Sequence, residues 1–174
     1  MNLFELFSEP TRLKGYNKRL MIPDIAYEYL RRNNYKYKND EFWQKTAPVK
    51  TAINTIAKDA HYSFNYARFV LYSRFIEGEA AIAKSAEYSY RYAAYMIDDR
   101  FELGEAQIAT SAEYSYKYAD DVLNTRFELG EEQIAKSDYY SYNYALHVLN
   151  GRFPAGEEVM ATDDIIWEKY NELI

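Results

Sequence analysis

Residues 82–107 read IAKSAEYSYRYAAYMIDDRFELGEAQ, and the chain then repeats this stretch with few changes. Residues 108–133 read IATSAEYSYKYADDVLNTRFELGEEQ, and residues 134–159 read IAKSDYYSYNYALHVLNGRFPAGEEV. An earlier copy, IAKDAHYSFNYARFVLYSRFIEGEAA, occupies residues 56–81, and a shortened copy begins at residue 160. The copies start at 56, 82, 108 and 134, which is a strict period of 26 residues. A repeat of this length indicates a stacked array of small structural units.

Each copy predicts a long first helix, which we call helix A. We call the residues at one equivalent position of successive copies a column. The column just before helix A holds only good N-capping residues: Asp59, Ser85, Ser111, Ser137 and Asp163. About 14 residues of helical periodicity follow, and the tyrosine, serine and alanine positions that barely change between copies cover an arc of roughly 200°. We therefore expect helix A to be packed on two sides, with its small serine and alanine columns where neighbouring helices approach closely.

A shorter helix B is predicted to follow the Arg-Phe pair of each copy. Pro154 marks its first residue, because proline is favoured in the first turn of a helix. The phenylalanine and isoleucine columns would fill the space between helices A and B, and neighbouring hairpins would complete each apolar face. The predicted fold is an all-α, α-solenoid-like array of helical hairpins over residues 56–174. A capping half-unit is expected from residue 160, where bulky Trp167 replaces the serine.

Residues 1–55 are predicted to form a helical, mildly basic segment that precedes the acidic array. Asp24 is a plausible N-cap for a helix through about Arg32, and Pro48 is expected to open a helix that runs through Ala57. The stretch from Asn33 to Thr46 has no clean period, so we interpret it as a degenerate or replaced repeat.

Composition excludes several classes of function. The 174 residues contain no cysteine, which removes disulfides, thiol catalysis and zinc–thiolate sites. No stretch approaches the apolar length of a membrane span, and the start MNLFELFSEP is too short and acidic for a signal peptide, so we expect a cytoplasmic protein with no membrane partner. Residues 1–50 carry 10 Lys/Arg against 6 Asp/Glu, a net charge of +4, whereas residues 51–174 carry 11 against 21, a net charge of −10.

The residues with catalytic chemistry favour a non-enzymatic protein. The two histidines, His61 and His147, lie more than three copies apart, on the order of tens of ångströms in a stacked array, and cannot share a metal or a substrate. The arginine and glutamate columns recur in every copy, whereas a catalytic site is normally single. We therefore interpret each Arg/Glu pair as a structural tie and predict no catalytic residue, metal or cofactor.

The repeat signature YSYxYAxxVLxxRFELGExxIAxS resembles the short tandem repeats of uncharacterised bacteriophage proteins. The resemblance covers about residues 56–174 and is clearest in these residues: Tyr144, Ala145, Val148, Leu149, Gly151, Arg152, Phe153, Gly156 and Glu157. It implies a small helical array of phage or prophage origin. By association, it also implies an early protein that acts on host machinery, including defence systems.

The columns that vary between copies predict a partner-binding surface on the side of helix A opposite the tyrosine arc. The candidate residues combine exposed aromatic or aliphatic side chains with carboxylates: Phe69, Tyr72, Tyr95, Asp98, Asp120, Asp121, Tyr139, Leu146 and His147. The carboxylates leave two interpretations open. They form a solvated face that keeps the array in solution, or a ladder of charge that imitates nucleic-acid phosphates and binds a basic groove.

Three functions remain in view. The first is a phage-type module that binds a host protein, such as a nucleic-acid-binding or defence protein, and inhibits or redirects it. The alternative is a scaffold that forms homo-oligomers and inhibits nothing. Direct nucleic-acid binding is disfavoured, because a body with a net charge of −10 opposes phosphate contacts. That third function would use these basic residues: Arg12, Lys14, Lys18, Arg19, Arg31 and Arg32.

Overall fold

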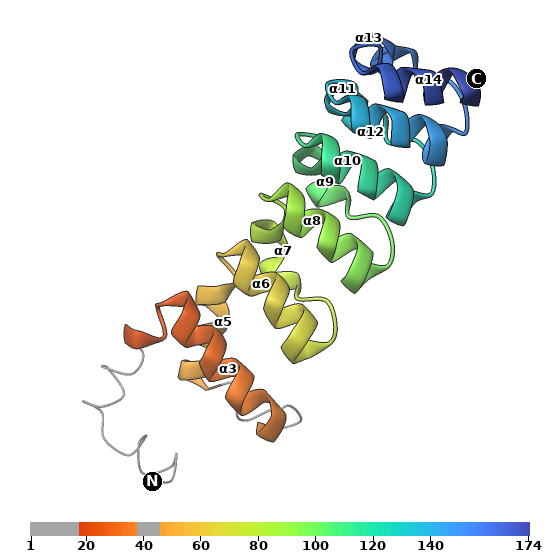
Figure 1. The fold of residues 1–174 in the computed structure, drawn as a ribbon. Coiled ribbons are helices and arrows are strands. Elements are labelled where there is room, and N and C mark those ends of the chain that lie inside the picture. The colour runs from red at the N-terminus through yellow and green to blue at the C-terminus, as the bar shows by residue number, and fades with distance from the viewer. Residues whose placement is uncertain (1–17, 38–45) are drawn as a thin grey trace. The chain divides into compact units, whose positions relative to one another are not determined.

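The computed structural model of the chain describes residues 18–37 and 46–174, and the regular elements in these ranges are all helices (Figure 1). The chain divides into two compact units, unit 1 over residues 1–82 and unit 2 over residues 83–174. Within each unit, helices pack as successive hairpins. The predicted all-α helical repeat array is confirmed.

Unit 2 consists of three hairpins and a last helix, in a two-layer arrangement. Its elements are α8 (Ala86–Tyr92), η2 (Ala93–Ile97), α9 (Glu102–Ile108), α10 (Ala112–Tyr118), η3 (Ala119–Leu123), α11 (Glu128–Ile134), α12 (Asp138–Asn143), η4 (Tyr144–Leu149), η5 (Pro154–Gly156), α13 (Glu157–Met160) and α14 (Asp164–Leu173). The first three helices A of this unit are α-helices continued by a short π-helical turn, as in α8 with η2, whereas α14 has no such turn. The helices A pack side by side from α8 to α14, and α9 packs against α11 in the helix B layer.

Unit 1 contains one hairpin of the repeated type and one that precedes it. Its elements are α3 (Pro23–Tyr37), α5 (Ala47–Ile56), α6 (Ala60–Tyr66), η1 (Ala67–Leu71) and α7 (Ile76–Ile82). Helix α3 packs against α5, α6 and η1, so it occupies the place of a helix A beside the first copy. The helix predicted from Pro48 is confirmed as α5, which holds this proline in its first turn and has Ala57 as its C-cap.

Two predictions for α3 were wrong. Asp24 lies inside the first turn, because the helix already begins at Pro23, a residue that suits the first position. The helix also continues past Arg32 to Tyr37. The first residues of the stretch interpreted as a degenerate repeat therefore belong to α3, and the part of that stretch from residue 38 to residue 45 lies outside the described residues.

The predicted caps and core columns are confirmed. The side chains of the capping column accept hydrogen bonds from backbone N–H groups of the first turn, such as Asp59 Oδ1 from Tyr62 N at 3.0 Å and Asp163 Oδ1 from Ile166 N at 3.0 Å. The phenylalanine, isoleucine and central tyrosine columns are buried. Trp167, which replaces the serine in the last copy, stacks its indole on Tyr170 with ring centroids 5.6 Å apart.

A serine of helix A meets a glycine of helix B inside each hairpin. Ser115 is fully buried, and its Oγ donates a hydrogen bond to the carbonyl oxygen of Ile108 at 3.1 Å. A Cβ atom placed on Gly130 would lie 2.5 Å from the Cβ and Oγ atoms of Ser115. The two helices therefore approach as closely as their backbones allow, which is why these columns hold only small residues.

Helix A ends in a π-helical turn that the sequence analysis did not predict. In η2, the backbone N–H of Asp98 donates to the carbonyl oxygen of Ala93 at 2.8 Å, a bond that spans five residues. The residue that closes each turn has a left-handed backbone conformation. The positive φ angles are 55° at Tyr72, 55° at Asp98, 50° at Asn124 and 47° at Asn150.

The serine–glycine contact predicts a specific loss of stability. We expect Gly130→Ala to lower the free energy of unfolding by about 1–3 kcal/mol, because the new methyl group would overlap Ser115. Gly151→Ala is the matched control, since the nearest atom to its Cβ would lie at 3.9 Å, and a change within about 0.5 kcal/mol is expected there. Urea unfolding followed by circular dichroism measures both. Equal losses in the two variants would contradict the close approach.

Candidate partner-binding surface

One polar contact recurs at every junction between repeats in unit 2. The hydroxyl of Tyr118 accepts a hydrogen bond from the backbone N–H of Phe101 at 2.9 Å and donates one to Glu105 at 2.9 Å. Glu105 is held in turn by two 2.9 Å hydrogen bonds from Arg100. The next junctions repeat these contacts with Tyr144, Phe127, Glu131 and Arg126, and with Tyr170, Phe153, Glu157 and Arg152. We call each set a rung.

The rungs confirm that the repeated Arg/Glu pairs tie the structure together. Burial raises the pKa of the Tyr118 and Tyr144 hydroxyls, so both remain protonated donors near neutral pH. Hydrogen bonds from Arg152 and then from Tyr170 lower the pKa of Glu157, which keeps this acceptor ionised. The tyrosine hydroxyl, the backbone N–H and the glutamate of each rung therefore have partners within the protein.

The nine candidate residues lie in two separate places. Phe69 and Tyr72 belong to unit 1, where 52% and 79% of their side chains are exposed. The other seven belong to unit 2. Tyr95 and Tyr139 are exposed by 54% and 59%. Asp98, Asp121 and His147 are also exposed, whereas Asp120 and Leu146 are half-buried.

The hydroxyl groups of Tyr90 and Tyr116 lie close to four of these candidate residues. Tyr90 donates a 2.5 Å hydrogen bond to Asp121 of the next repeat and also contacts Tyr95. Tyr116 donates a 2.8 Å hydrogen bond to Asp120 on its own helix and also lies near Asp121 and Tyr139. The carboxylate of Asp121 therefore serves the packing of two helices A as well as the surface, whereas that of Asp120 bonds within its own helix.

The sequence analysis missed Tyr90 and Tyr116 as members of this surface. Both fall in the tyrosine arc that we assigned to the core, and Tyr90 is indeed buried, but Tyr116 is half-buried. Burial, followed by hydrogen bonding to Asp121 or Asp120, raises the pKa of both hydroxyls. The available signal was their place at the edge of the arc, next to the variable columns.

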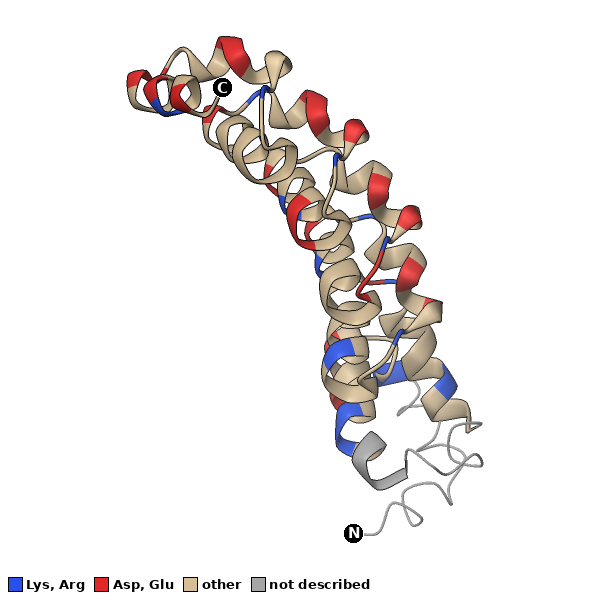
Figure 2. Cartoon of the chain, turned by 90° about the vertical axis from the view of Figure 1, so that its right-hand side faces the viewer, with Lys and Arg blue, Asp and Glu red and all other residues tan. Residues whose placement is uncertain are grey.

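The charges on the helix A face of unit 2 are only partly compensated. Arg91 is paired with Glu87 at 3.0 Å, and Lys117 with Glu113 at 2.6 Å. In unit 2, no Lys or Arg forms an ion pair with the three candidate carboxylates, which are Asp98, Asp120 and Asp121. Figure 2 shows that acidic residues recur from repeat to repeat in this unit mainly in the short helices B. The surface therefore attracts cationic groups.

The backbone explains one column that the sequence analysis interpreted as variable surface. Asp98, Asn124 and Asn150 close their helices in the left-handed conformation, which asparagine and aspartate tolerate better than other side chains. The exchange of aspartate for asparagine in this column is therefore explained by the left-handed backbone conformation. Tyr72 is the exception, because it adopts this conformation without a short polar side chain, and it is the most exposed of the aromatic candidates.

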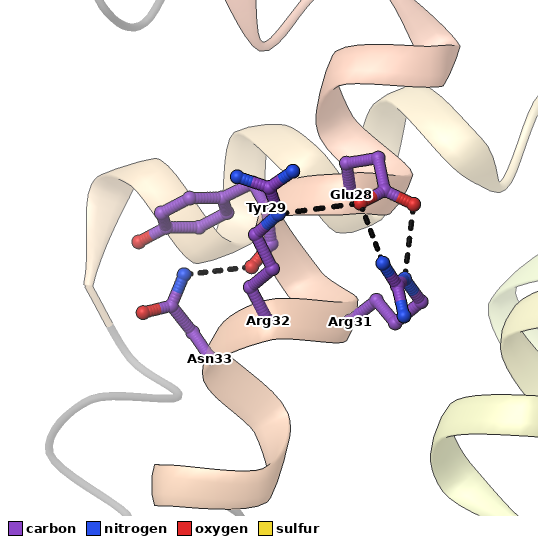
Figure 3. Close-up of polar contacts among 5 residues, drawn as sticks. All are labelled: Glu28, Tyr29, Arg31, Arg32 and Asn33. Atoms are coloured by element: carbon purple, nitrogen blue, oxygen red, sulfur yellow. Dashed lines mark hydrogen bonds and ion pairs between the residues drawn. The ribbon is translucent and has the colours of Figure 1, made fainter.

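The basic side chains of α3 are partly neutralised (Figure 3). Arg31 donates two 2.9 Å hydrogen bonds to Glu28, and Arg32 donates one at 3.3 Å to the same carboxylate. Asn33 Nδ2 donates to the carbonyl oxygen of Tyr29 at 2.7 Å. Lys18 and Arg19 are exposed. Arg12 and Lys14, the remaining members of the predicted basic group, lie outside the described residues.

Neither a metal-binding cluster nor a membrane-spanning helix occurs in the part of the chain that the structure describes. Within residues 18–37 and 46–174, no three His, Cys, Asp or Glu side chains are grouped to hold a metal ion. Among the helices of these residues, none has the length and apolar character needed to cross a membrane. Comparison with protein-family models, with curated proteins and with solved structures finds no match for this chain.

The bond between Tyr90 and Asp121 predicts energetic coupling between two repeats. In a double-mutant cycle, Tyr90→Phe and Asp121→Ala should show a coupling energy of about 1 kcal/mol, measured by urea unfolding. Tyr90→Phe combined with Asp120→Ala is the control, because Asp120 bonds to Tyr116 instead. That pair should be additive within about 0.5 kcal/mol, and equal coupling in both cycles would contradict the assignment.

The left-handed conformation of Tyr72 predicts a stabilising substitution. Tyr72→Asn should raise the free energy of unfolding by on the order of 1 kcal/mol, because asparagine adopts this conformation at lower cost. The reverse exchange, Asn124→Tyr, should lower stability by a similar amount. Thermal unfolding measures both variants. A Tyr72→Asn protein that is less stable than the parent would show that the tyrosine side chain makes a compensating contact.

Proposed function

We propose that this chain is a non-enzymatic, protein-binding repeat module. It would bind its partner through the exposed helix A surface of unit 2, here called the A-face, which consists of Tyr95, Asp98, Asp120, Asp121, Tyr139, Leu146 and His147. One observation carries the proposal. In unit 2, the recurring arginine, glutamate and tyrosine residues are bonded to one another in rungs, whereas most of the variable side chains of the A-face are exposed and only Asp120 and Leu146 are half-buried.

The chemistry of the A-face favours a protein with a basic surface as the partner. Exposed tyrosines such as Tyr95 and Tyr139 supply large, stiff contact areas of the kind that dominates protein interfaces. The carboxylates of Asp98, Asp120 and Asp121 would complement lysine or arginine side chains and accelerate association. The same charges would repel nucleic-acid phosphates, so direct nucleic-acid binding is disfavoured.

The resemblance to phage repeat proteins identifies the partner to test first. A bacterial host protein that binds nucleic acid, such as a defence protein, carries the basic groove that an acidic surface could occupy. Binding there would inhibit or redirect the host protein by imitating its phosphate ligand. This part of the proposal rests on the resemblance and on charge complementarity.

The test compares two matched pairs of substitutions. The double variant with Tyr95→Ala and Tyr139→Ala should bind the partner at least tenfold more weakly, because two exposed aromatic side chains are removed. Glu102→Ala with Glu128→Ala, on the exposed side of helix B, should leave binding within about threefold of the parent. Binding is measured by retention of proteins from a bacterial host lysate and then by calorimetry with the purified partner, after circular dichroism has confirmed unchanged helicity.

Asp98→Asn adds a charge test that preserves the left-handed backbone. It should weaken binding and reduce the dependence of affinity on salt concentration. If the variant that carries Tyr95→Ala and Tyr139→Ala retains the partner as well as the parent protein does, the A-face is not the binding site. Loss of binding in the helix B variant alone would move the site to the opposite layer.

A further inference from the structure

A second exposed apolar surface lies in the helix B layer of unit 2. Leu103 of α9 and Leu129 of α11 occupy the same position in successive repeats, and 60% and 63% of these residues are exposed. Helices α9 and α11 pack side by side. The exposed carboxylates on these helices are Glu102, Glu128 and Glu132. We call this set of leucines and glutamates the B-face. Neither the rungs nor the A-face uses it.

Unit 1 carries a surface of the opposite charge. Met21 and Ile22, just before α3, and Ile25, in its first turn, are exposed by 69%, 50% and 38%. Lys18 and Arg19, which the buried Leu20 separates from Met21, are exposed as well. We call these five residues the α3 patch. Among the described residues, Leu20, Ala26 and Leu30 fill the buried side of this segment, whereas the apolar side chains of the patch remain exposed.

We infer that the B-face of one molecule binds the α3 patch of a second copy of this chain. The leucines would pack against the methionine and isoleucines, and the glutamates would face the lysine and arginine. The net charges of the two units have opposite signs, as an attraction between the B-face and the α3 patch requires. Unit 1 carries 13 Lys/Arg against 9 Asp/Glu, a net charge of +4, and unit 2 carries 8 against 18, a net charge of −10.

The two surfaces differ from each other, so the contact is heterologous. Each molecule therefore keeps one free B-face or one free α3 patch after pairing, and association continues into rings or open chains. The few apolar side chains involved make each contact small, which predicts weak association that depends on protein concentration. The inference goes beyond the proposed function, because it leaves the A-face open to a different protein.

The experiment uses two complementary variants of the full chain. Variant one, Lys18→Glu with Arg19→Glu and Met21→Ser, removes the α3 patch and keeps the B-face. Variant two, Leu103→Ser with Leu129→Ser, removes the leucines and keeps the α3 patch. Sedimentation velocity is recorded from about 10 µM to about 300 µM, a range that covers weak contacts. The parent should sediment faster as concentration rises, and each variant alone should remain a monomer.

An equimolar mixture of the two variants provides the decisive measurement. Each molecule then has one intact surface, so the mixture should form dimers and nothing larger. Tyr139→Ala, a change on the A-face, should associate as the parent does. A parent that is monomeric at every concentration would overturn the inference. So would a mixture that forms no dimer, or association that is lost in the Tyr139→Ala protein. The first two of these results would leave partner binding by the A-face untouched, whereas the third would show that the A-face itself mediates self-association.

Discussion

A tyrosine hydroxyl buried at each junction of unit 2 is the contact on which the array depends. Tyr118 provides the acceptor for the N–H of Phe101 at the position where the chain leaves one helix A and enters helix B. A buried N–H without an acceptor costs about 1–3 kcal/mol, so this one hydroxyl stabilises the turn of the preceding repeat. Its donation to Glu105, which Arg100 holds in place, fixes the register between the two repeats.

Most of the fold could be predicted because it depends on local chemistry that is repeated. Capping residues such as Ser111 and the proline at position 154 act within one turn, and the 26-residue period shows that each hairpin needs neighbours. The π-helical end of helix A could not be predicted in this way. It depends on carbonyls such as that of Ala93 accepting bonds from N–H groups five residues further on, and hydrophobic periodicity does not reveal that choice.

The candidate surface was predictable only in outline. Variation between repeats identified exposed positions such as Tyr95. It could not distinguish positions that bind a partner from positions whose residues are chosen for a backbone conformation. The column of Asp98 and Asn124 varies within the set of residues that suits a left-handed conformation. Likewise, the sequence indicated only that Asp121 is a charged surface residue. In the structure its carboxylate accepts a hydrogen bond from Tyr90, which lies 31 residues earlier on a neighbouring helix. Contacts of that kind depend on packing angles and not on spacing.

The geometry of the rungs also bears on how such a chain can change length. Each rung joins a glutamate to a tyrosine thirteen residues later, and the copies are 26 residues apart. Removing residues 108–133 would bring Tyr144 to the position of Tyr118, thirteen residues after Glu105. Recombination between copies of the underlying coding sequence could therefore shorten or lengthen the array by whole repeats, and every new junction would contain the same set of hydrogen-bonding partners as the old one.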